Sequence, residues 1–467
     1  MIEQKMQPAP SQSLLLTDFY QLTMLQAYWA AHMTETAVFE LFVRKLPPTR
    51  NFLMAAGQEQ ALDFLAGLRF SPEELDYLRD SGQFSADFVD WLSRFRFAGD
   101  VDAMPEGTIF FADEPIIRIT APLPEAQLVE TRLMNILHYQ TLVASKAARM
   151  VLAAPHRLLI DFGLRRAHGS EAGLLAARAS FIAGFSGTAS VFAGGKFGIP
   201  VSGTMTHSFI QAHETEEAAF LAFARARPKK LILLIDTFDT IAATAKVVRI
   251  APTLKAEGIT IHGVHIDSGD LAEDAFNVRR ILDAGGFYDI MIYVSGGLDE
   301  DKLRDLISCD APIAGFGIGT NLVTSSDAPA LDCAYKLQEY AGIARRKTSP
   351  GKVTWPGRKQ VWRSFSPDGT MTGDMITLVH DRQPGRPLLT PVMRSGQRLP
   401  DRPSIVEIRA FASDQLSRLP ESLRGPKSSY RVGIAPALQR LRDECAKREA
   451  SLSRSEPILP SDQTGHL

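Results

Sequence analysis

The sequence predicts an α/β protein of more than one domain, whose largest part is a parallel sheet buried between helices. The chain has 467 residues, whereas single hydrophobic cores stop growing at roughly 250–300 residues, so two or more domains are expected. From residue 157 onward, short apolar runs alternate with helical stretches. That alternation is typical of parallel strands that helices cover on both faces.

The first part of the chain has a different rhythm and predicts a mixed α+β domain. Proline and glycine divide short β-branched and aromatic runs here, and a cap residue precedes a proline at Ser71-Pro72, as at a helix start. The expected elements are a helix over 14–31, a strand over 36–43, a helix over 52–68, a helix after 71, short strands over 101–123 and a long helix over 125–147.

The apolar runs that follow are the expected strands of the parallel sheet. They are RLLIDF (157–162), SVFAG (190–194), FGIPV (197–201), KLILLID (230–236), ITIHGVHID (259–267), YDIMIYVS (288–295) and PIAGFGIG (312–319). The last three end roughly two to three dozen residues apart, the length of one βα unit.

Beyond residue 337 the chain returns to short strands and turns. KTSPGK (347–352) and WPGRK (355–359) are hairpin signals. The polar stretches over 1–12 and from about 450 to the end are expected to be flexible.

Composition excludes several classes of protein. The 51 Lys and Arg residues balance 53 Asp and Glu residues, and this lack of a basic excess argues against a nucleic-acid-binding protein. Cys309, Cys333 and Cys445 are too few and too scattered for a disulfide framework or a four-ligand zinc site, so a reducing, cytoplasmic location is expected. No signal peptide is expected, because the first residues are polar and contain proline in place of an apolar h-region. No membrane span is expected either, because no apolar run approaches roughly 18–20 residues.

Polar residues and glycines follow the expected strands at their carboxyl ends. The segments are Asp161 to Arg166, Gly203 to His207, Asp236-Thr237, Asp267 to Asp270, Ser295 to Gly297 and Ile318 to Asn321. In (β/α) barrels the active site is built on this rim, from the loops that follow the strands. The repetition at strand after strand predicts a barrel with its site there.

Two of these rim segments favour phosphate binding. SGG (295–297) and GIGT (317–320) offer glycines through which backbone N–H groups can approach an anion closely. Either turn alone is more often a structural feature. Together, on the last two strands, they favour a phosphate site.

Two carboxylates of the rim flank a Ser-Gly turn. Asp267 and Asp270 have the chemistry to bind ribose hydroxyls or Mg²⁺ that carries a polyphosphate. Asp270 is also expected to cap the helix that begins near Leu271. Asp267 ends an apolar strand, where a purely structural role is harder to justify.

Basic residues complete the rim. Arg165 and Arg166 follow a glycine turn and are suited to grip a phosphate, although one of them is expected to form only a surface salt bridge. His207 lies at a helix start, where a lone histidine is more often a structural hydrogen bonder than a catalyst. His213 is six residues further on and faces another way, so the two are not expected to share a metal ion.

With these residues assembled, the chain resembles the nicotinate phosphoribosyltransferases. The matching segments are LLTDFYQLTM (15–24), EGTIFFADEPIIRI (106–119), DFGLRRAHG (161–169), GTMTHSF (203–209), GVHIDSGDL (263–271), VSGGLDE (294–300), GFGIGT (315–320) and KTSPGKVTWPGRKQVWR (347–363). The resemblance implies an irregular (β/α) barrel with an N-terminal α+β domain that a C-terminal segment completes. The implied boundaries are 1–124 for the N-terminal domain, 125–343 for the barrel, 344–450 for the C-terminal segment and 451–467 for a flexible tail.

The resemblance also implies the reaction. Nicotinate and phosphoribosyl pyrophosphate give nicotinate mononucleotide and pyrophosphate, a step of NAD biosynthesis and salvage. ATP is a co-substrate whose hydrolysis is coupled through a transient phosphohistidine, Mg²⁺ is the cofactor, and a homodimer shares its active sites between subunits.

By the same resemblance, His207 is the histidine that is phosphorylated, Arg165 lies near the pyrophosphate and Asp267 contacts the ribose hydroxyls. Thr204 contacts nicotinate, and Phe162 stacks on one face of its ring while Tyr20 reaches in from a neighbouring subunit. The cradle of the 5-phosphate comprises Gly297, Gly317, Gly319 and Thr320, and Ser295 and Gly296 are further substrate-binding residues. No metal ligand is fixed by the protein, and Mg²⁺ is expected to arrive with the substrate near Asp267.

Two positions bear on the substrate. Ala189 stands where a sister family that uses nicotinamide carries an Asp, and an uncharged residue there favours the acid. His265 stands where the family commonly carries an Arg that contacts a substrate anion. A histidine supplies at most one charge, and we expect His265 to bind substrate as a hydrogen-bond donor.

Two alternatives remain open. A sugar-phosphate aldolase would need a Schiff-base lysine in a barrel strand or at its carboxyl end, but Lys230 opens its strand instead. A catalytically impaired paralogue that binds nucleotide as a regulator is suggested only by His265.

Overall fold

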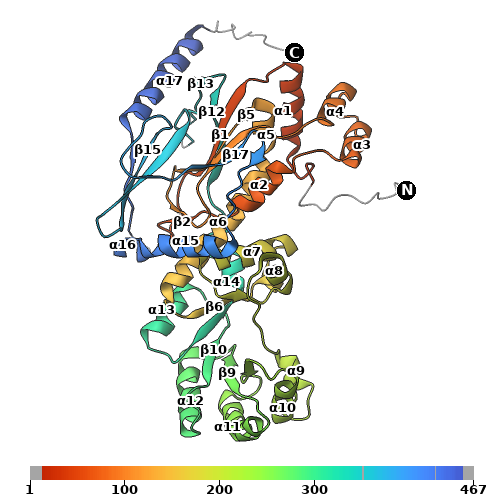
Figure 1. Ribbon diagram of the computed structural model, residues 1–467, viewed down its shortest axis with the longest axis vertical. Helices are drawn as coiled ribbons and strands as arrows, with labels where there is room; N and C mark the ends of the chain where they lie inside the picture. Colours follow the sequence, from red (N-terminus) through yellow and green to blue (C-terminus); the bar gives the residue numbers. More distant parts are fainter. Residues whose placement is uncertain (1–12, 350–351, 426–427, 456–467) are drawn as a thin grey trace, which may run out of the picture.

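The chain folds into two stacked parts, an upper part of antiparallel sheets and a lower barrel of parallel strands (Figure 1). The computed structural model describes residues 13–349, 352–425 and 428–455. The expected leader over 1–12 and the tail beyond 455 lie outside these residues, as does part of the KTSPGK turn.

The lower part contains a six-stranded parallel sheet in the order β7-β6-β11-β10-β9-β8. Its strands are β6 (Leu158–Asp161), β7 (Gly187–Thr188), β8 (Leu231–Leu234), β9 (Ile261–Ile266), β10 (Met291–Val294) and β11 (Gly315–Ile318). The first long strand, β6, pairs with the last, β11, so the sheet curls on itself, while β7 and β8 form its two unpaired edges. This arrangement confirms the predicted irregular (β/α) barrel.

Helices cover the outer face of this barrel because all but α14, which follows the last strand, connect one parallel strand to the next. They are η2 (Leu164–Arg166), α7 (Ser170–Ala183), α8 (Val191–Phe197), α9 (His207–Gln211), α10 (Glu216–Ala226), α11 (Thr240–Ala256), α12 (Leu271–Ala284), α13 (Glu300–Ser308) and α14 (Thr320–Val323). Alternate strand residues such as Leu233, Val264 and Ile292 are buried, as the apolar runs predict.

The upper part is built on a seven-stranded sheet in the order β13-β12-β1-β5-β3-β17-β18. The strands are β1 (Thr36–Val43), β3 (Asp100–Ala103), β5 (Pro115–Pro122), β12 (Cys333–Tyr340), β13 (Ile343–Ala344), β17 (Thr390–Arg394) and β18 (Gln397–Arg398). Strands from the middle and the end of the chain therefore pair with the N-terminal strands.

Helices of the upper part flank this sheet, and one long helix joins the two parts. The flanking helices are α1 (Phe19–Ala30), α2 (Gln58–Ala66), α3 (Pro72–Asp80), α4 (Ala86–Leu92) and α5 (Leu123–Leu128). The joining helix α6 (Glu130–Ala153) is largely buried between the two parts. Ser71 and Glu74 form a capping box at the start of α3, as the sequence predicts.

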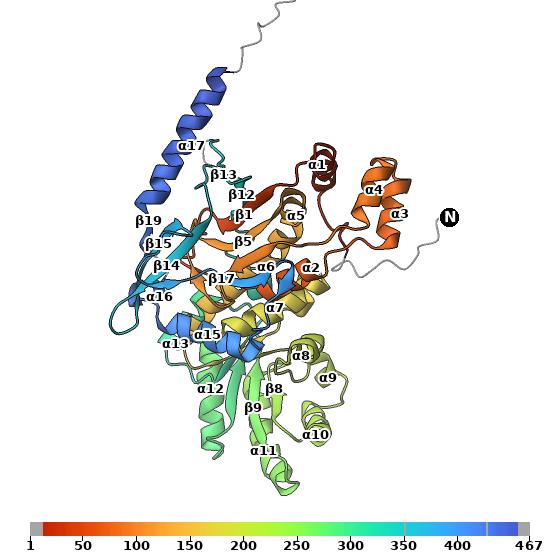
Figure 2. The ribbon, with the colours of Figure 1, turned by 45° about the horizontal axis from the view of Figure 1, so that its top comes forward.

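The C-terminal residues add a second, smaller sheet. Its strands are β14 (Lys359–Phe365), β15 (Met371–Leu378), β16 (Arg386–Pro387) and β19 (Val432–Ile434), beside a short pair of β2 (Leu53–Met54) and β4 (Ile109–Phe110). The helices are α15 (Ile405–Ser417), α16 (Glu421–Arg424) and α17 (Pro436–Ser455). Helix α17 projects away from the sheet (Figure 2) and extends into the first residues of the expected tail.

Three sequence predictions are wrong in their secondary structure. The expected strand over 190–194 is helix α8, because the Ser190 side chain accepts from the Ala193 amide and starts a helix. The expected strand over 197–201 is loop, with a single bridge from Thr188 to Val201, and the strand that joins the sheet is β7. The expected helix over 52–68 begins at Gln58, after strand β2.

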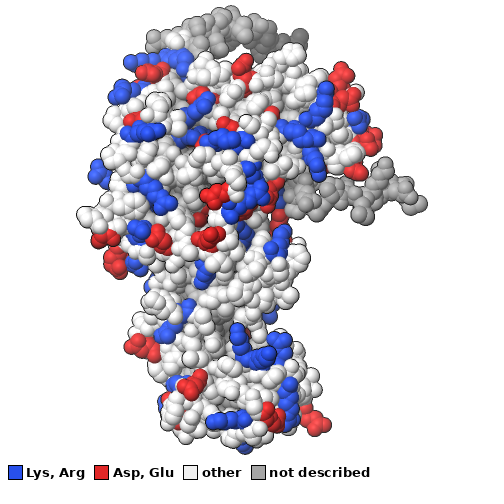
Figure 3. Space-filling view, in the orientation of Figure 1, with Lys and Arg blue, Asp and Glu red and all other residues white. Residues whose placement is uncertain are grey.

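The surface agrees with the balanced composition. Basic and acidic side chains are interspersed over the face in Figure 3. No helix among the described residues is long and apolar enough to cross a membrane. The three cysteines, which all lie in the described part of the chain, are free thiols.

Candidate active site

The end of strand β6 organises the turn that carries Phe162 and Arg165. Asp161 is buried, and its carboxylate accepts from the Gly163 amide at 2.8 Å and from the Thr188 hydroxyl at 2.7 Å. Burial raises the pKa of Asp161, although these two hydrogen bonds oppose the rise. Asp161 therefore holds the turn against β7, and its two oxygens are already engaged.

Phe162 lies across the neighbouring strand β11. A Cβ placed on Gly317 would be 2.4 Å from the Phe162 ring, so the ring occupies space that only a glycine leaves free. The same ring packs edge-on against His265, with 6.2 Å between centroids and 69° between planes. Phe162 thus presents an aromatic surface at the rim, beside the end of β9.

A hydrogen-bonded chain joins the ends of β9 and β10. The His265 Nε2 atom lies 2.8 Å from the Ser295 Oγ atom, and the Ser295 hydroxyl donates to the Asp267 carboxylate. Because that hydroxyl has a single proton, Nε2 must be the donor in the bond between His265 and Ser295. Burial lowers the pKa of His265 against the opposing charges of Asp267 and Asp236, which favours the neutral ring.

The end of β8 supplies a further carboxylate. Asp236 Oδ2 accepts from the Asp267 amide at 2.9 Å and from the Ser268 hydroxyl at 2.6 Å. Its other oxygen, Oδ1, is buried with no hydrogen-bond partner in the described part of the chain. The sequence placed Asp236 on the rim but gave it no role. The available signal was a carboxylate directly after an apolar strand, the same signal that singled out Asp267.

His207 and Thr204 are both tied to the region of β8. The His207 Nδ1 atom lies 3.1 Å from the Thr237 hydroxyl oxygen, and the Thr204 hydroxyl donates to the Ile232 carbonyl. His207 is the first residue of α9. These bonds bring the loop before α9 against the carboxyl end of the barrel, as the sequence predicts.

The two glycine turns lie next to each other. Gly296 and Gly297 have φ values of +101° and +59°, and a Cβ on Gly296 would lie 2.3 Å from the Asp267 carbonyl oxygen. The Asn321 side-chain amide, directly after Thr320, donates to the Gly297 and Leu298 carbonyls at 3.1 and 3.0 Å. The structure therefore brings Ser295, Gly296, Gly297, Gly317, Gly319 and Thr320 to one part of the rim.

The remaining predicted residues lie on η2, α12 and α1; η2 contacts α14, and Asp270 lines a cavity together with Asp267 and Gly296. Arg165 and Arg166 are exposed on η2, and neither forms an ion pair with a described residue, so the surface salt bridge expected for one of them is wrong. Asp270 caps α12, as predicted, by accepting from two backbone amides at 3.1 Å. Tyr20 is on α1 in the upper part, far from the barrel strands in Figure 1.

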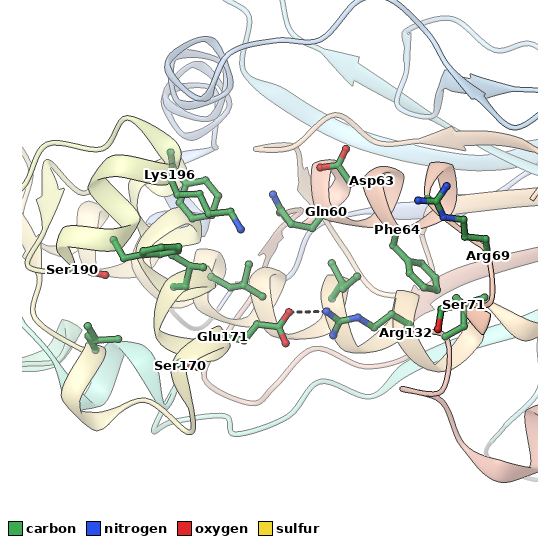
Figure 4. A pocket seen from close by; sticks show the side chains of 18 of the residues that line it. Gln60, Asp63, Phe64, Arg69, Ser71, Arg132, Ser170, Glu171, Ser190 and Lys196 are labelled. Atoms are coloured by element: carbon green, nitrogen blue, oxygen red, sulfur yellow. Dashed lines mark hydrogen bonds and ion pairs between the residues drawn. The ribbon is translucent and has the colours of Figure 1, made fainter. Parts of the chain in front are cut away.

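A cavity of about 880 Å³ lies between the two parts, next to the rim. Figure 4 shows Lys196 on α8 at one side and Phe64 on α2 at the other. An ion pair between Arg132 and Glu171, at 2.6 Å, lies along its base. Leu164, from the turn that carries Arg165, also lines the cavity, so the cavity reaches this turn.

Taken together, the open α/β barrel and its rim define the class of the protein. Carboxylates, a histidine and paired glycine turns at the carboxyl ends of parallel strands are typical of barrel enzymes that act on phosphorylated substrates.

Comparison with known proteins identifies the family within this class. Three family models match: the nicotinate phosphoribosyltransferase N-terminal domain over residues 15–138, the nicotinate phosphoribosyltransferase family over 158–347, and the nicotinate phosphoribosyltransferase C-terminal domain over 385–442. The chain belongs to the nicotinate phosphoribosyltransferase family.

Individual relatives agree with the family models. A nicotinate phosphoribosyltransferase of Mycobacterium tuberculosis is 46% identical over 95% of this chain and 96% of its own length. That of Bacillus subtilis is 40% identical over 79% of this chain and 76% of its own length. The crystal structure of human nicotinic acid phosphoribosyltransferase has a TM-score of 0.81 and 28% identity, and the match covers 92% of this chain and 100% of that one.

Proposed function

We propose that this protein is a nicotinate phosphoribosyltransferase of NAD biosynthesis, which joins nicotinate to phosphoribosyl pyrophosphate and releases pyrophosphate. The observation that carries the proposal is the arrangement of the rim. An aromatic ring, the carboxylate of Asp267 and two glycine turns converge at the ends of β6, β9, β10 and β11. Relatives named for this activity align over nearly the whole chain.

Each residue of the rim is proposed to bind a different part of the substrates. Phe162 stacks on the nicotinate ring, and Thr204 contacts it. Asp267 accepts from the ribose hydroxyls, and the turns at 295–297 and 317–320 bind the 5-phosphate. This placement holds the nicotinate nitrogen behind C1 of the ribose while the bond from C1 to pyrophosphate breaks. Positioning and electrostatic stabilisation supply most of the catalysis, so no strong acid or base is required.

Arg165 and Mg²⁺ are proposed to stabilise the pyrophosphate. The described residues contain no group of three or more side chains that could hold a metal ion. This fits a Mg²⁺ ion that arrives with the substrate, since Mg²⁺ is usually bound through one or two carboxylates plus phosphates. Asp236 Oδ1, buried and unpartnered, and the neighbouring Asp267 would hold it. When bound, Mg²⁺ neutralises charge on the pyrophosphate.

His207 is proposed to accept the γ-phosphoryl group of ATP. The bond from its Nδ1 atom to Thr237 fixes the orientation of the ring, and Nε2 makes no hydrogen bond with a described residue. Phosphorylation at Nε2 would place a dianion at the rim and change the affinity for substrate. ATP cleavage would then be coupled to binding through a difference in affinity between two states.

A homodimer with shared active sites is proposed as the working form. Large apolar side chains are exposed on both parts of the molecule: Phe19 (58%) and Tyr20 (47%) on α1, and Val191 (76%) and Phe192 (70%) on α8. The two pairs lie on different elements, so α1 of one copy can cover α8 of another. Tyr20 would thereby reach the neighbouring nicotinate site.

The acid is the preferred substrate in this proposal. Ala189 is exposed on the rim, and its amide donates to the Asp161 carbonyl at 2.8 Å. A carboxylate at this position would repel the carboxylate of nicotinate, whereas alanine does not. Nicotinamide is expected to be the poorer substrate.

One assay tests the proposal. Purified protein with nicotinate, phosphoribosyl pyrophosphate and Mg²⁺ should form nicotinate mononucleotide, faster with ATP than without.

Two further experiments test single residues. Label from γ-³²P ATP should enter the protein in acid-labile form and be absent from His207→Ala, and label retained in that variant would refute the assignment of His207. A His265→Arg variant with unchanged substrate KM values would show that position 265 does not bind substrate. Binding of nucleotide without any mononucleotide formed would instead support the impaired regulator.

A further inference from the structure

The two glycine turns of the rim are tied to each other by one side chain on their outer side. Asn321 follows the GIGT turn directly, and its amide group donates to two consecutive carbonyls of the other turn, Gly297 at 3.1 Å and Leu298 at 3.0 Å. The ammonium group of Lys302 donates to the Gly297 carbonyl as well, at 3.0 Å. The backbone conformation of residues 295–298 is therefore held by the side chains of Asn321 and Lys302 as well as by the sheet.

A second tie lies on the inner side. Lys146 of α6 is buried at 1% exposure, and its Nζ atom lies 2.6 Å from a Glu300 oxygen and 2.9 Å from Asp327 Oδ1. Glu300 is the first residue of α13, three residues after Gly297. Asp327 follows α14, which begins at Thr320. Lys146 thus connects the segments that leave the two turns.

The inner tie is electrically balanced and anchored in the upper part of the molecule. Arg50 contacts Asp327 through two nitrogens, at 2.9 and 3.0 Å, and also donates to the Leu142 carbonyl at 2.8 Å. Burial alone would raise the pKa of Asp327, but hydrogen bonds and charge from Arg50 and Lys146 hold this pKa far below its usual range. Two cations and two carboxylates therefore form one network of ion pairs.

We propose that Asn321 and Lys146 are positioning residues that hold the SGG and GIGT turns as one preformed cradle for the phosphate monoester of a sugar phosphate. Glycine-rich turns lose much conformational freedom when they bind, and that loss weakens affinity unless other contacts have already ordered them. Neither residue needs to touch the substrate. This inference rests on the proposed function, because it assumes that the turns bind the 5-phosphate.

The test compares Asn321→Ala with Asn277→Ala. Asn277, on the neighbouring α12, is also partly buried and makes no side-chain hydrogen bond with a described residue. We expect Asn321→Ala to raise the KM for phosphoribosyl pyrophosphate and the Kd for ribose 5-phosphate about tenfold, the effect of roughly 1.4 kcal/mol from two lost hydrogen bonds. The KM for nicotinate and the Tm should stay as in the wild type. Asn321→Asp should weaken binding further, because a carboxylate opposes both carbonyls and the phosphate. Asn277→Ala should change none of these values.

Equal changes in both KM values, or a fall in Tm without a selective change, would show a merely structural role and overturn the inference for Asn321. Lys146→Met tests the inner tie. It should weaken ribose 5-phosphate binding selectively and also lower the Tm, because the buried Glu300 and the partly buried Asp327 lose a cation. A folded Lys146→Met protein with wild-type affinity for ribose 5-phosphate would contradict the role of Lys146.

The design separates this inference from the proposed function. A wild-type protein that binds ribose 5-phosphate but forms no mononucleotide refutes the function, while the Kd values of the variants still decide the inference. A wild-type protein that forms mononucleotide while Asn321→Ala is unaffected refutes the inference alone. A wild-type protein that binds no ribose 5-phosphate refutes the cradle itself.

Discussion

Removing the Arg178 guanidinium should destabilise the junction between the barrel and the upper part. Arg178, on α7, makes two hydrogen bonds to Glu106, at 2.7 and 2.6 Å, and one to Gln140 at 3.3 Å. Glu106 lies just before β4 and also accepts from the Gly57 amide at 2.6 Å. The side chains of Arg178 and Glu106 are 4% and 2% exposed, so water replaces none of these contacts.

The structure sets the size of the effect. Arg178→Met removes two charge-assisted hydrogen bonds, worth about 1.5–3 kcal/mol each, and leaves a buried carboxylate without its cation. Breaking a buried ion pair in this way typically costs about 3–5 kcal/mol. Protonation of Glu106 limits the loss, because each unit between the pH and the new pKa of Glu106 costs only about 1.4 kcal/mol. We expect about 3–5 kcal/mol for Arg178→Met, and a double variant with Glu106→Gln that loses less than the sum of the two single variants.

The assay is urea unfolding followed by tryptophan fluorescence. Exposed Arg225, which forms a two-pronged pair with Glu257, provides the control, and Arg225→Met should change stability little. Burial alone would raise the pKa of Glu106, but the charge and hydrogen bonds of Arg178 hold it below its usual value. A lowered pKa in the folded state stabilises the protein above the unfolded-state pKa, and the stabilisation is lost as the pH falls through the folded-state pKa. The unfolded-state pKa of Glu106 is the same in both proteins, so the difference in stability between wild type and Arg178→Met should shrink as the pH falls from the raised pKa of Glu106 in the variant to its lowered pKa in the wild type. A loss of under about 1 kcal/mol near neutral pH, or strict additivity in the double variant, would refute the reasoning.

Three further changes have defined outcomes. Burial, and then the charge of Asp374, raises the pKa of Glu114 well above its usual value, so the stability contributed by its protonated form is lost as the pH rises. In urea titrations, the free energy of unfolding of Glu114→Gln should therefore rise relative to that of the wild type between pH 4 and pH 8. A difference that does not change with pH would contradict this. Gly296→Ala should abolish binding of ribose 5-phosphate in calorimetry, because its Cβ would lie 2.3 Å from a backbone oxygen at a φ of +101°. Gly195→Ala, where a Cβ meets nothing within 4 Å, should leave that binding intact. Phe192→Glu should shift the protein from dimer to monomer in sedimentation velocity, since it places a charge on the exposed face of α8. A dimer that is unchanged by this substitution would show that α8 does not form the interface.

Sequence pattern predicted most of the fold because the signals are local. Continuous apolar runs predicted β6, β8, β9, β10 and β11, and each predicted end lies within one to three residues of the observed end of the strand. The run at 190–194 misled because valine and phenylalanine favour strands, whereas the Ser190 cap starts a helix there. Propensity is a weak guide when a cap and tertiary packing favour a different structure.

Part of the candidate site was also visible in the sequence. Asp267, Ser295 and the glycines directly follow apolar strands, and parallel strands bring their carboxyl ends to one edge. Asp236 carried the same signal but received no role. Asn321 belonged to the predicted rim segment 318–321 but received no role. Lys146 carried no signal, because a lysine in a long helix is an ordinary surface choice.

By itself, the sequence determined the fold class, the rim and the family. These depend on periodicity and short motifs, which are written in neighbouring residues. Only the tertiary structure decided that His265 donates to Ser295, that Asp236 keeps one oxygen free, and that Lys146 joins Glu300 to Asp327. Lys146 lies more than 150 residues from both partners. A hydrogen bond or buried ion pair forms only within a narrow range of distance and angle, and that range is set by the packing of distant segments.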